Sequence, residues 1–231
     1  EPLASNRANV EGTLNLLVAS EKAKVKRFVY ASSSSVYGSA GPLPRTEDLP
    51  LDPISPYGVS KLAGECYARV WSELFGLETV VLRYFNIFGP RQNPQAQYAA
   101  VIPKFISAVL NARPPTIYGD GEQSRDFTYV ENVVLANWLA IHSSSVSGEV
   151  FNVACGERTT VNQLARLINE IVGTNLKSIH SEPRPGDVPH SYADITKARR
   201  LLGFEPGIDL KEGLKKTIEY FEKTGSPSCQ T

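Results

Sequence analysis

Strand-like and helix-like segments alternate along this chain of 231 residues. Short apolar runs rich in Val, Ile and Tyr are followed by longer stretches in which apolar residues recur every three or four positions. Alternation of this kind is typical of α/β proteins, because parallel strands need crossover connections that are usually helices. The pattern predicts strands over 26–31, 78–88, 115–118, 149–154 and 177–181, and helices over 5–23, 57–75, 99–111, 130–142, 161–172, 194–202 and 210–223.

The composition excludes several classes of protein. Lys plus Arg number 24 and Asp plus Glu number 24, so the net charge of zero gives no basic surface that would indicate nucleic acid or an anionic membrane as a partner. No apolar run has the length of a membrane span, and no signal peptide opens the chain. The cysteines Cys66, Cys155 and Cys229 lack metal-ligand spacing, so we expect no metal site and reduced thiols in a cytoplasmic protein.

Tyr57 and Lys61 stand four residues apart at the start of a predicted helix, so they share one face of it. An ammonium beside a phenol lowers the pKa of the phenol and makes it usable as an acid or base. A pair with this spacing arises by chance about once in such a chain. Its position is more informative, because strand 26–31 ends in four serines, Ser32 to Ser35, and a long polar loop then leads to the pair. A loop of that length, 38–56, is predicted to be functional.

Several motifs, taken in order, resemble the extended short-chain dehydrogenase/reductases of the NAD-dependent epimerase/dehydratase family. Within that group the resemblance is to nucleotide-sugar 4-epimerases acting on UDP-glucose or UDP-N-acetylglucosamine, and it runs from about residue 1 to residue 222. The motifs are Asn9-Val-x-Gly-Thr13, Val29-Tyr-Ala-Ser-Ser-Ser-Ser-Val-Tyr-Gly38, Ser55-Pro-Tyr-Gly-Val-Ser-Lys61, Leu82-Arg-Tyr-Phe-Asn-Ile-Phe-Gly89, Ala99-Ala-Val-Ile-Pro103, Tyr118-Gly-Asp-Gly121, Ser124-Arg-Asp-Phe127 and Arg184-Pro-Gly-Asp-Val188 with His190-Ser191.

The resemblance implies a catalytic group and a cofactor, NAD. Tyr57 would take the proton of the sugar 4-hydroxyl, Ser33 would relay it, and Lys61 would bind the nicotinamide ribose and lower the pKa of Tyr57. The residues expected on the cofactor side, besides Tyr57 and Lys61, are Asn9, Ser32 and Tyr84. Asn9 has a simpler interpretation as an amide on a helix face.

The resemblance also implies a UDP-sugar site. Asn86, Arg125 and Arg184 would hold the diphosphate, which suits arginine because its planar cation binds phosphate with two hydrogen bonds. The other substrate residues would be Ser33 and Ser34 at the sugar, Val101 and Tyr118 at the uracil, Asp187 at the ribose and Ser191 at the sugar pocket. Simpler alternatives remain: an Arg125 bridge to Asp126, a strand-end cap by Asn86, a solvated Arg184 and an uninvolved Ser191.

The implied fold is α/β: the C-terminal part of a Rossmann-type doubly wound parallel sheet plus a smaller α/β substrate-binding domain. Residues 1–88 with 126–160 would form the NAD-binding part, 89–125 with 161–224 the nucleotide-sugar-binding part, and 225–231 a flexible tail. A homodimer would form through helices 5–23 and 57–75, although their apolar faces are equally compatible with packing on the sheet.

Departures from the family pattern separate the possible activities. Dehydratases and decarboxylases carry acids where this chain has Ser33 to Ser35, so the hydroxyls favour an epimerase. Ser191 is small where a bulky residue restricts the pocket to plain hexoses, so N-acetylhexosamines are expected to fit.

The family's glycine-rich motif for the NAD pyrophosphate is absent from the sequence. We expect on the order of ninety residues of βα units to precede Glu1 in a complete enzyme. The alternatives are a truncated, non-catalytic sugar-nucleotide-binding protein, or another extended short-chain dehydrogenase/reductase, namely a dehydratase, decarboxylase or reductase.

Overall fold

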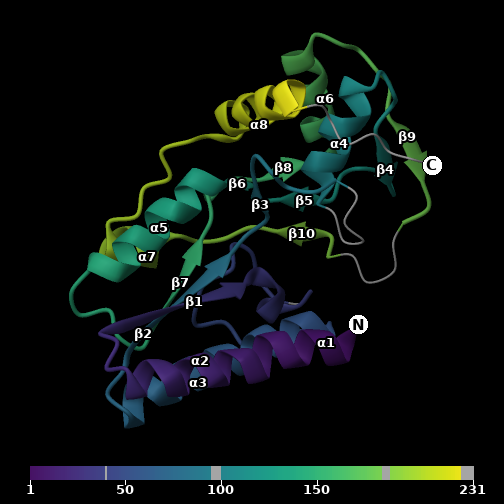
Figure 1. Cartoon of the computed structure of the whole chain (residues 1–231). Coiled ribbons are helices and arrows are strands. Elements are labelled where there is room, and N and C mark those ends of the chain that lie inside the picture. The colour runs from purple at the N-terminus through teal and green to yellow at the C-terminus, as the bar shows by residue number, and fades with distance from the viewer. Residues whose placement is uncertain (40, 95–99, 184–187, 225–231) are drawn as a thin grey trace.

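A three-stranded parallel sheet lies at the centre of the larger part of the molecule (Figure 1). The computed structural model describes residues 1–39, 41–94, 100–183 and 188–224. The strands of this sheet are β1 (Arg27–Ser33), β2 (Glu78–Tyr84) and β7 (Glu149–Val153), in the order β1-β2-β7. Ser33 faces Tyr84 across the register, so the carboxyl ends of β1 and β2 are level. The α/β prediction is therefore confirmed.

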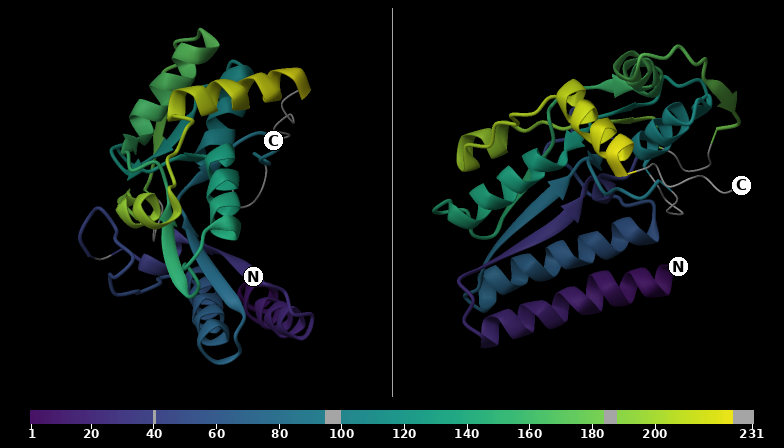
Figure 2. Two further views of the ribbon diagram at one scale, coloured as in Figure 1. Left: turned by 90° about the vertical axis from the view of Figure 1, so that its left-hand side faces the viewer. Right: turned by 45° about the horizontal axis from the view of Figure 1, so that its top comes forward.

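Helices cover both faces of this sheet (Figures 1 and 2). Below it, α1 (Pro2–Asn6), a π-helical turn (Arg7–Glu11) and α2 (Gly12–Lys22) form one continuous rod beside α3 (Pro56–Leu74). On the other face lie α5 (Val130–His142) and α7 (Thr196–Leu202). Covering both faces is what parallel strands require, because their two rows of side chains are both apolar.

The alternation of side chains in β2 shows how the two faces differ. Thr79 and Val81 point to α3, where the Thr79 hydroxyl donates to the carbonyl of Ala68 at 2.8 Å. Val80 and Leu82 point the other way and pack with α5 and β7. The predicted strand 78–88 does not continue unbroken. Asn86 adopts a left-handed φ of 35°, and a separate short strand, β3 (Ile87–Phe88), follows.

The second part of the molecule has its own apolar core. Helices α4 (Val101–Leu110), α6 (Val161–Val172) and α8 (Leu210–Thr224) pack around it. Four short strand pairings border these helices: β3 with β6 (Thr128–Tyr129), β4 (Thr116–Tyr118) with β9 (Ile179–Ser181), and β5 (Ser124–Arg125) between β8 (Thr159–Thr160) and β10 (His190–Ser191).

Local signals placed the ends of several helices correctly. Helix α5 has the predicted bounds, and so does α6, where Thr160 and Gln163 form a reciprocal capping box. Helix α4 begins at Val101, one residue after Ala100, and ends at Leu110, whereas the predicted range is 99–111; Ala99 lies outside the described residues. Within the part of the chain that the structure describes, no helix combines the length and apolar character needed to cross a membrane.

The core clusters bear on the proposed division of the chain. Ala198, Leu202 and Phe204 pack with the side chains of β7 and α5, on the sheet side of the molecule. The division into 1–88 with 126–160 and 89–125 with 161–224 stays a prediction. The proposed tail, 225–231, lies outside the described residues.

Candidate active site

The first turn of α3 packs directly against the serines that follow β1. Ser33 Oγ accepts hydrogen bonds from the amide and the hydroxyl of Ser35, at 3.2 and 3.0 Å. A Cβ atom on Gly58 would lie 2.8 Å from the carbonyl oxygen of Ser35, so only glycine allows this approach. Ser55 caps the helix by accepting from the amide of Gly58 at 3.1 Å. The structure thus brings Tyr57 beside the serine segment (3-10 turn Ser34–Tyr37).

Lys61 lies between two tyrosine rings. Its ammonium is 5.8 Å from the ring centroid of Tyr57 and 5.5 Å from that of Tyr30, and it donates to the carbonyl of Ala31 at 3.0 Å. Burial lowers the pKa of Lys61 below its ordinary value of 10.5. Tyr57 remains 45% exposed, so its phenol is accessible to a ligand. The predicted side-by-side placement of phenol and ammonium is present.

Ser32 points away from Ser33, into the interior. Its hydroxyl donates to the carboxylate of Glu65, which also holds Arg83 through Nε and Nη2 at 3.0 and 2.8 Å. Because this hydroxyl is engaged under α3, a cofactor contact by Ser32 would use its backbone. Sequence reasoning missed the Glu65–Arg83 pair. The available signal was the spacing of Glu65, four residues after Lys61 and therefore on the same helix face.

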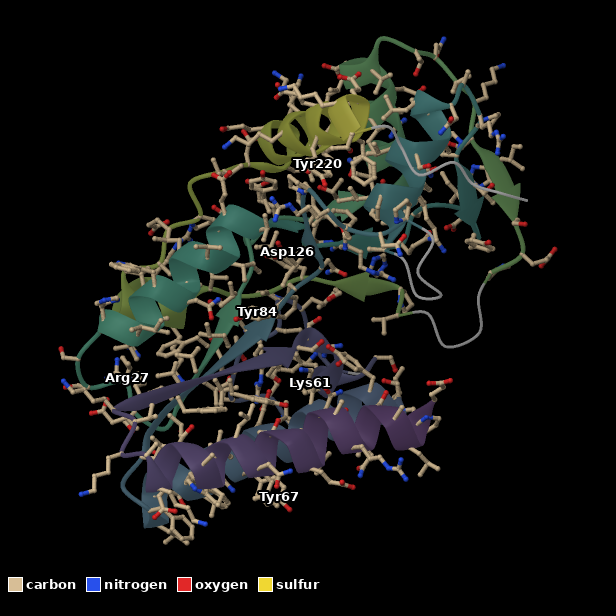
Figure 3. All side chains as sticks on the ribbon, in the orientation of Figure 1. Arg27, Lys61, Tyr67, Tyr84, Asp126 and Tyr220 are labelled. Carbon is tan, nitrogen blue, oxygen red and sulfur yellow. The ribbon has the colours of Figure 1, made fainter. Side chains whose placement is uncertain are left out.

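Asn9 and Tyr84 support the site from opposite faces of the sheet. Asn9, inside the π-helical turn, donates to the hydroxyl of Ser60 at 3.0 Å, and Ser60 donates to the carbonyl of Tyr57 at 2.8 Å. The Tyr84 hydroxyl bonds the amide of Asn137 in α5, 2.9 Å from its Nδ2, and burial raises the pKa of Tyr84. Asn9 thus braces the turn that carries Tyr57, whereas Tyr84 lies toward α5 (Figure 3).

A cavity of about 250 Å³ opens beside the carboxyl ends of the strands. It gathers four of the predicted substrate residues, Asn86, Val101, Tyr118 and Arg125. Its other walls are mostly apolar: Ile87, Phe88, Ala100, Ile102, Phe105, Thr116, Ile117, Gln123, Phe127 and Val161. Apolar walls with a few polar groups are typical of small-molecule sites. Arg184 and Asp187 lie outside the described residues.

Arg125 is fixed at the rim of this cavity by backbone carbonyls. Its Nη1 donates to Ser124 at 3.0 Å and to Pro189 at 3.2 Å. The predicted sugar-pocket residue, Ser191, pairs with Arg125 in the register of β10 and β5. Asp126, the acid considered as a partner for Arg125, instead receives hydrogen bonds from the backbone amides of Cys155 and Gly156, at 2.9 and 3.0 Å.

Ser33 and the cavity both lie at the carboxyl ends of β1 and β2. Ser33 faces Tyr84 across β1 and β2, and Asn86 of the cavity follows Tyr84 by two residues. Ligands of open parallel sheets bind outside the carboxyl ends of the strands, which is where both groups lie. Among the described residues, no group of three or more metal-ligating side chains is present.

Comparison with known proteins shows what the chain is similar to. The family model described as the NAD dependent epimerase/dehydratase family matches residues 1–154. A putative UDP-glucose 4-epimerase of Methanocaldococcus jannaschii is 40% identical over 222 residues, which span 96% of this chain and 71% of that protein.

Two solved structures extend this similarity to three dimensions. A UDP-N-acetylglucosamine 4-epimerase from Methanobrevibacter ruminantium, solved with UDP-N-acetylmuramic acid, is 42% identical with a TM-score of 0.93. A UDP-glucose 4-epimerase from Thermotoga maritima, solved with UDP-glucose, is 43% identical with the same TM-score, 0.93. Each comparison covers 97% of this chain and 72% of the other.

Proposed function

Since the chain belongs to the NAD-dependent epimerase/dehydratase family of extended short-chain dehydrogenase/reductases, we propose that it acts as a nucleotide-sugar 4-epimerase. Its substrate would be a UDP-hexose or a UDP-N-acetylhexosamine, inverted at C4 through a transient 4-keto sugar. The observation that carries the proposal is the cavity. It joins Asn86, Val101, Tyr118 and Arg125 beside the carboxyl ends of β1 and β2, where Ser33 lies.

NAD is the cofactor of this family, and when bound it supplies the acceptor and donor of hydride for C4 of the sugar. The donor set at the end of β1 suits the nicotinamide end of NAD. Lys61 carries an ammonium that can donate to ribose hydroxyls, and Tyr57 carries a phenol beside it. Asn9, Ser32 and Tyr84 are the further residues proposed for this side.

Tyr57 and Ser33 would handle the proton. The Tyr57 phenolate accepts the proton of the sugar 4-hydroxyl, and the Ser33 hydroxyl hydrogen-bonds the same oxygen. Lys61 stands one helical turn from Tyr57, with its ammonium 5.8 Å from the centroid of the tyrosine ring. When the 4-keto sugar has turned over, Tyr57 returns the proton to the new hydroxyl. Ser34, next to Ser33, would contact the sugar.

The cavity would hold the nucleotide and the diphosphate. Arg125 would bind phosphate oxygens with its planar guanidinium, together with Asn86 and with Arg184. Val101 and Tyr118 would flank the uracil, and Asp187 the ribose. Ser191 lies next to Arg125 in the sheet register, where a small side chain leaves room for an N-acetyl group.

Helices α1, α2 and α3 support a homodimer as part of the proposal. They carry large apolar side chains that are exposed in the single chain, including Leu3 at 77%, Leu16 at 59% and Leu74 at 73%. Apolar groups left exposed on one face of a protein commonly mark an interface.

A direct test is binding of UDP followed by turnover. Titration calorimetry should show UDP binding to the protein, and Arg125→Met should weaken it. The protein supplied with NAD should then interconvert UDP-glucose and UDP-galactose, or their N-acetylated counterparts. Formation of a 4-keto-6-deoxy sugar or release of CO₂ in place of an epimer would reject the epimerase assignment.

A further inference from the structure

The carboxylate of Asp126 is completely buried, although it makes no direct contribution to the chemistry described above. The side chain is 0% exposed and lies between the two parts of the molecule (Figure 3). One oxygen accepts from the amide of Cys155 at 2.9 Å. The other accepts from the amides of Gly156 and Ala193, at 3.0 and 3.3 Å. One carboxylate thus ties together the segment after β7 and the segment after β10.

The backbone of Asp126 holds a third segment. Its carbonyl accepts from the side-chain amide of Asn86 at 3.1 Å, and the Asn86 carbonyl accepts from the amide of Thr128 at 3.2 Å. Asn86 has a left-handed φ of 35°, a conformation that needs support from its surroundings. The residues on either side of Phe127 therefore clamp Asn86 where the chain crosses from β2 to β3.

Asp126's own segment and two of the segments tied to it each carry a candidate substrate residue. Arg125 precedes Asp126, Asn86 is bonded to it, and Ser191 lies two residues before Ala193. Ser191 also pairs with Arg125 in the parallel register of β10 and β5. Through these contacts, the position of Asp126 bears on how Arg125, Asn86 and Ser191 are placed relative to one another.

The chemistry of this centre requires a carboxylate. The groups that point at it are backbone N–H donors, and an ionised carboxylate offers about four acceptor sites and no donor. An asparagine side chain has almost the same shape, but its NH₂ group is a donor. On one side it would face backbone N–H groups that are also donors, so no hydrogen bond could form there. Because burying an unpaired charge costs stability, an apolar residue would serve better if packing were the only requirement.

We propose that Asp126 is a positioning residue for the diphosphate-binding groups of the cavity, acting on the ligand through Arg125 and Asn86. The proposal rests on the proposed function, because the ligand in question is the diphosphate of a UDP-sugar. Asp126 itself does not touch the ligand.

The test is a double-mutant cycle read as affinity for UDP. By calorimetry, Asp126→Asn should weaken UDP binding about tenfold, the scale of hydrogen bonds made to a charged group. Arg125→Met should weaken it as well. The double variant should lose less affinity than the sum of the two single losses, because part of the effect of Asp126 is transmitted through that arginine. Losses that add in the double variant, or an unchanged affinity in Asp126→Asn, would overturn the proposal.

Two further measurements keep this result interpretable. Asp209→Asn is the matched control, since Asp209 is an exposed acid that caps α8 by accepting from the amide of Glu212 at 2.8 Å; UDP affinity should not change. If Asp126→Asn does not fold, the smaller Asp126→Ser takes its place in the cycle.

Amide hydrogen exchange separates this proposal from the proposed function. The amides of Cys155, Gly156 and Ala193 should exchange faster in Asp126→Asn than in the wild type. This readout needs no ligand. Absence of UDP binding by the wild-type protein would count against the UDP-sugar assignment alone, whereas unchanged exchange at these amides would overturn the role of Asp126.

Discussion

Glu65 and Arg83 form a buried ion pair, with Arg83 Nη2 2.8 Å from Glu65 Oε2 and Nε 3.0 Å from Oε1. The pair joins α3 to β2, and Glu65 also accepts from Ser32, the neighbour of Ser33. Arg83 Nη1 continues the network to the hydroxyl of Tyr37 at 2.9 Å, and Tyr37 donates to Asn152 of β7 at 2.7 Å. The network thus fixes the helix that carries Tyr57 to two strands of the sheet.

Arg83→Met should destabilise the protein by about 3–5 kcal/mol, because it leaves the Glu65 carboxylate buried without its cation. Combining it with Glu65→Met should recover much of that loss, since neither charge is then left alone. Urea denaturation followed by circular dichroism measures both. The matched control is Arg199→Met, at the exposed pair with Glu205, where about 0–1 kcal/mol is expected. A cost at Arg83 no larger than at Arg199 would contradict the prediction.

Gly58→Ala should displace the first turn of α3. The added methyl would lie 2.8 Å from the carbonyl of Ser35 and 2.9 Å from Pro53 Cβ, and overpacking of this kind costs about 1–3 kcal/mol. Thermal denaturation should show the loss of stability as a lower melting temperature. Turnover should fall as well, because Tyr57 moves with the turn. Gly207→Ala is the control, since a Cβ there meets no atom within 4 Å. Equal melting temperatures for the two variants would be inconsistent with a tight approach at Gly58.

Tyr57→Phe should abolish most turnover while leaving affinity for UDP-sugars nearly unchanged. The variant removes only the hydroxyl that is proposed to exchange a proton with the substrate, and the cavity residues are untouched. Epimerisation kinetics and calorimetry on the same preparation check both halves. Tyr67→Phe, on the same helix but packed against Trp71, should keep full activity. Substantial turnover in Tyr57→Phe would remove this residue from the proposed mechanism.

Ser191→Tyr should close the sugar pocket to N-acetylated substrates while sparing plain hexoses. The larger ring would occupy the space beside Arg125 that the 2-acetamido group needs. The informative measurement is the ratio of kcat/KM for UDP-N-acetylglucosamine to that for UDP-glucose, which should fall about tenfold or more. Ser191→Ala is the control and should leave the ratio unchanged. If Ser191→Tyr retained its N-acetylated substrates, Ser191 would have no gating role.

Burial raises the pKa of Asp126 from 3.8 to about 6, against the opposing effect of its backbone hydrogen bonds. The folded protein therefore holds this proton more tightly than the unfolded chain does. The resulting contribution to the free energy of unfolding is complete below pH 4 and is lost as the pH rises through 6. Relative to Asp126→Asn, which cannot titrate, the wild type should lose about 2 kcal/mol between pH 4.5 and 7.5. Urea denaturation across that range measures the difference, and a difference that stays constant would contradict a raised pKa.

Several elements could be predicted from the sequence because their causes are local. The bounds of helices 130–142 and 161–172 and the Tyr57–Lys61 spacing all depend on residues within one or two helical turns of each other. The ordered motifs likewise indicated the family and the α/β fold, which the comparisons confirmed. The roles assigned to individual site residues remain predictions.

Other contacts join segments that are distant in the sequence, and no local sequence pattern predicts them. Glu65 meets Arg83 across 18 residues, and Asp126 meets Cys155 across 29 and Ala193 across 67. The break in the predicted strand 78–88 arises because Asn86 is clamped by residues 126 and 128.

The sequence by itself thus determined the family and the set of candidate site residues, since both follow from functional groups and their spacing along the chain. Only the tertiary structure decided which of them share a cavity. It also decided that the Ser32 side chain points away from Ser33 and contacts Glu65, and that the Asp126 carboxylate lies among backbone amides. Burial and hydrogen-bond partners are properties of segments brought together by packing, and the order of residues along one segment does not encode them.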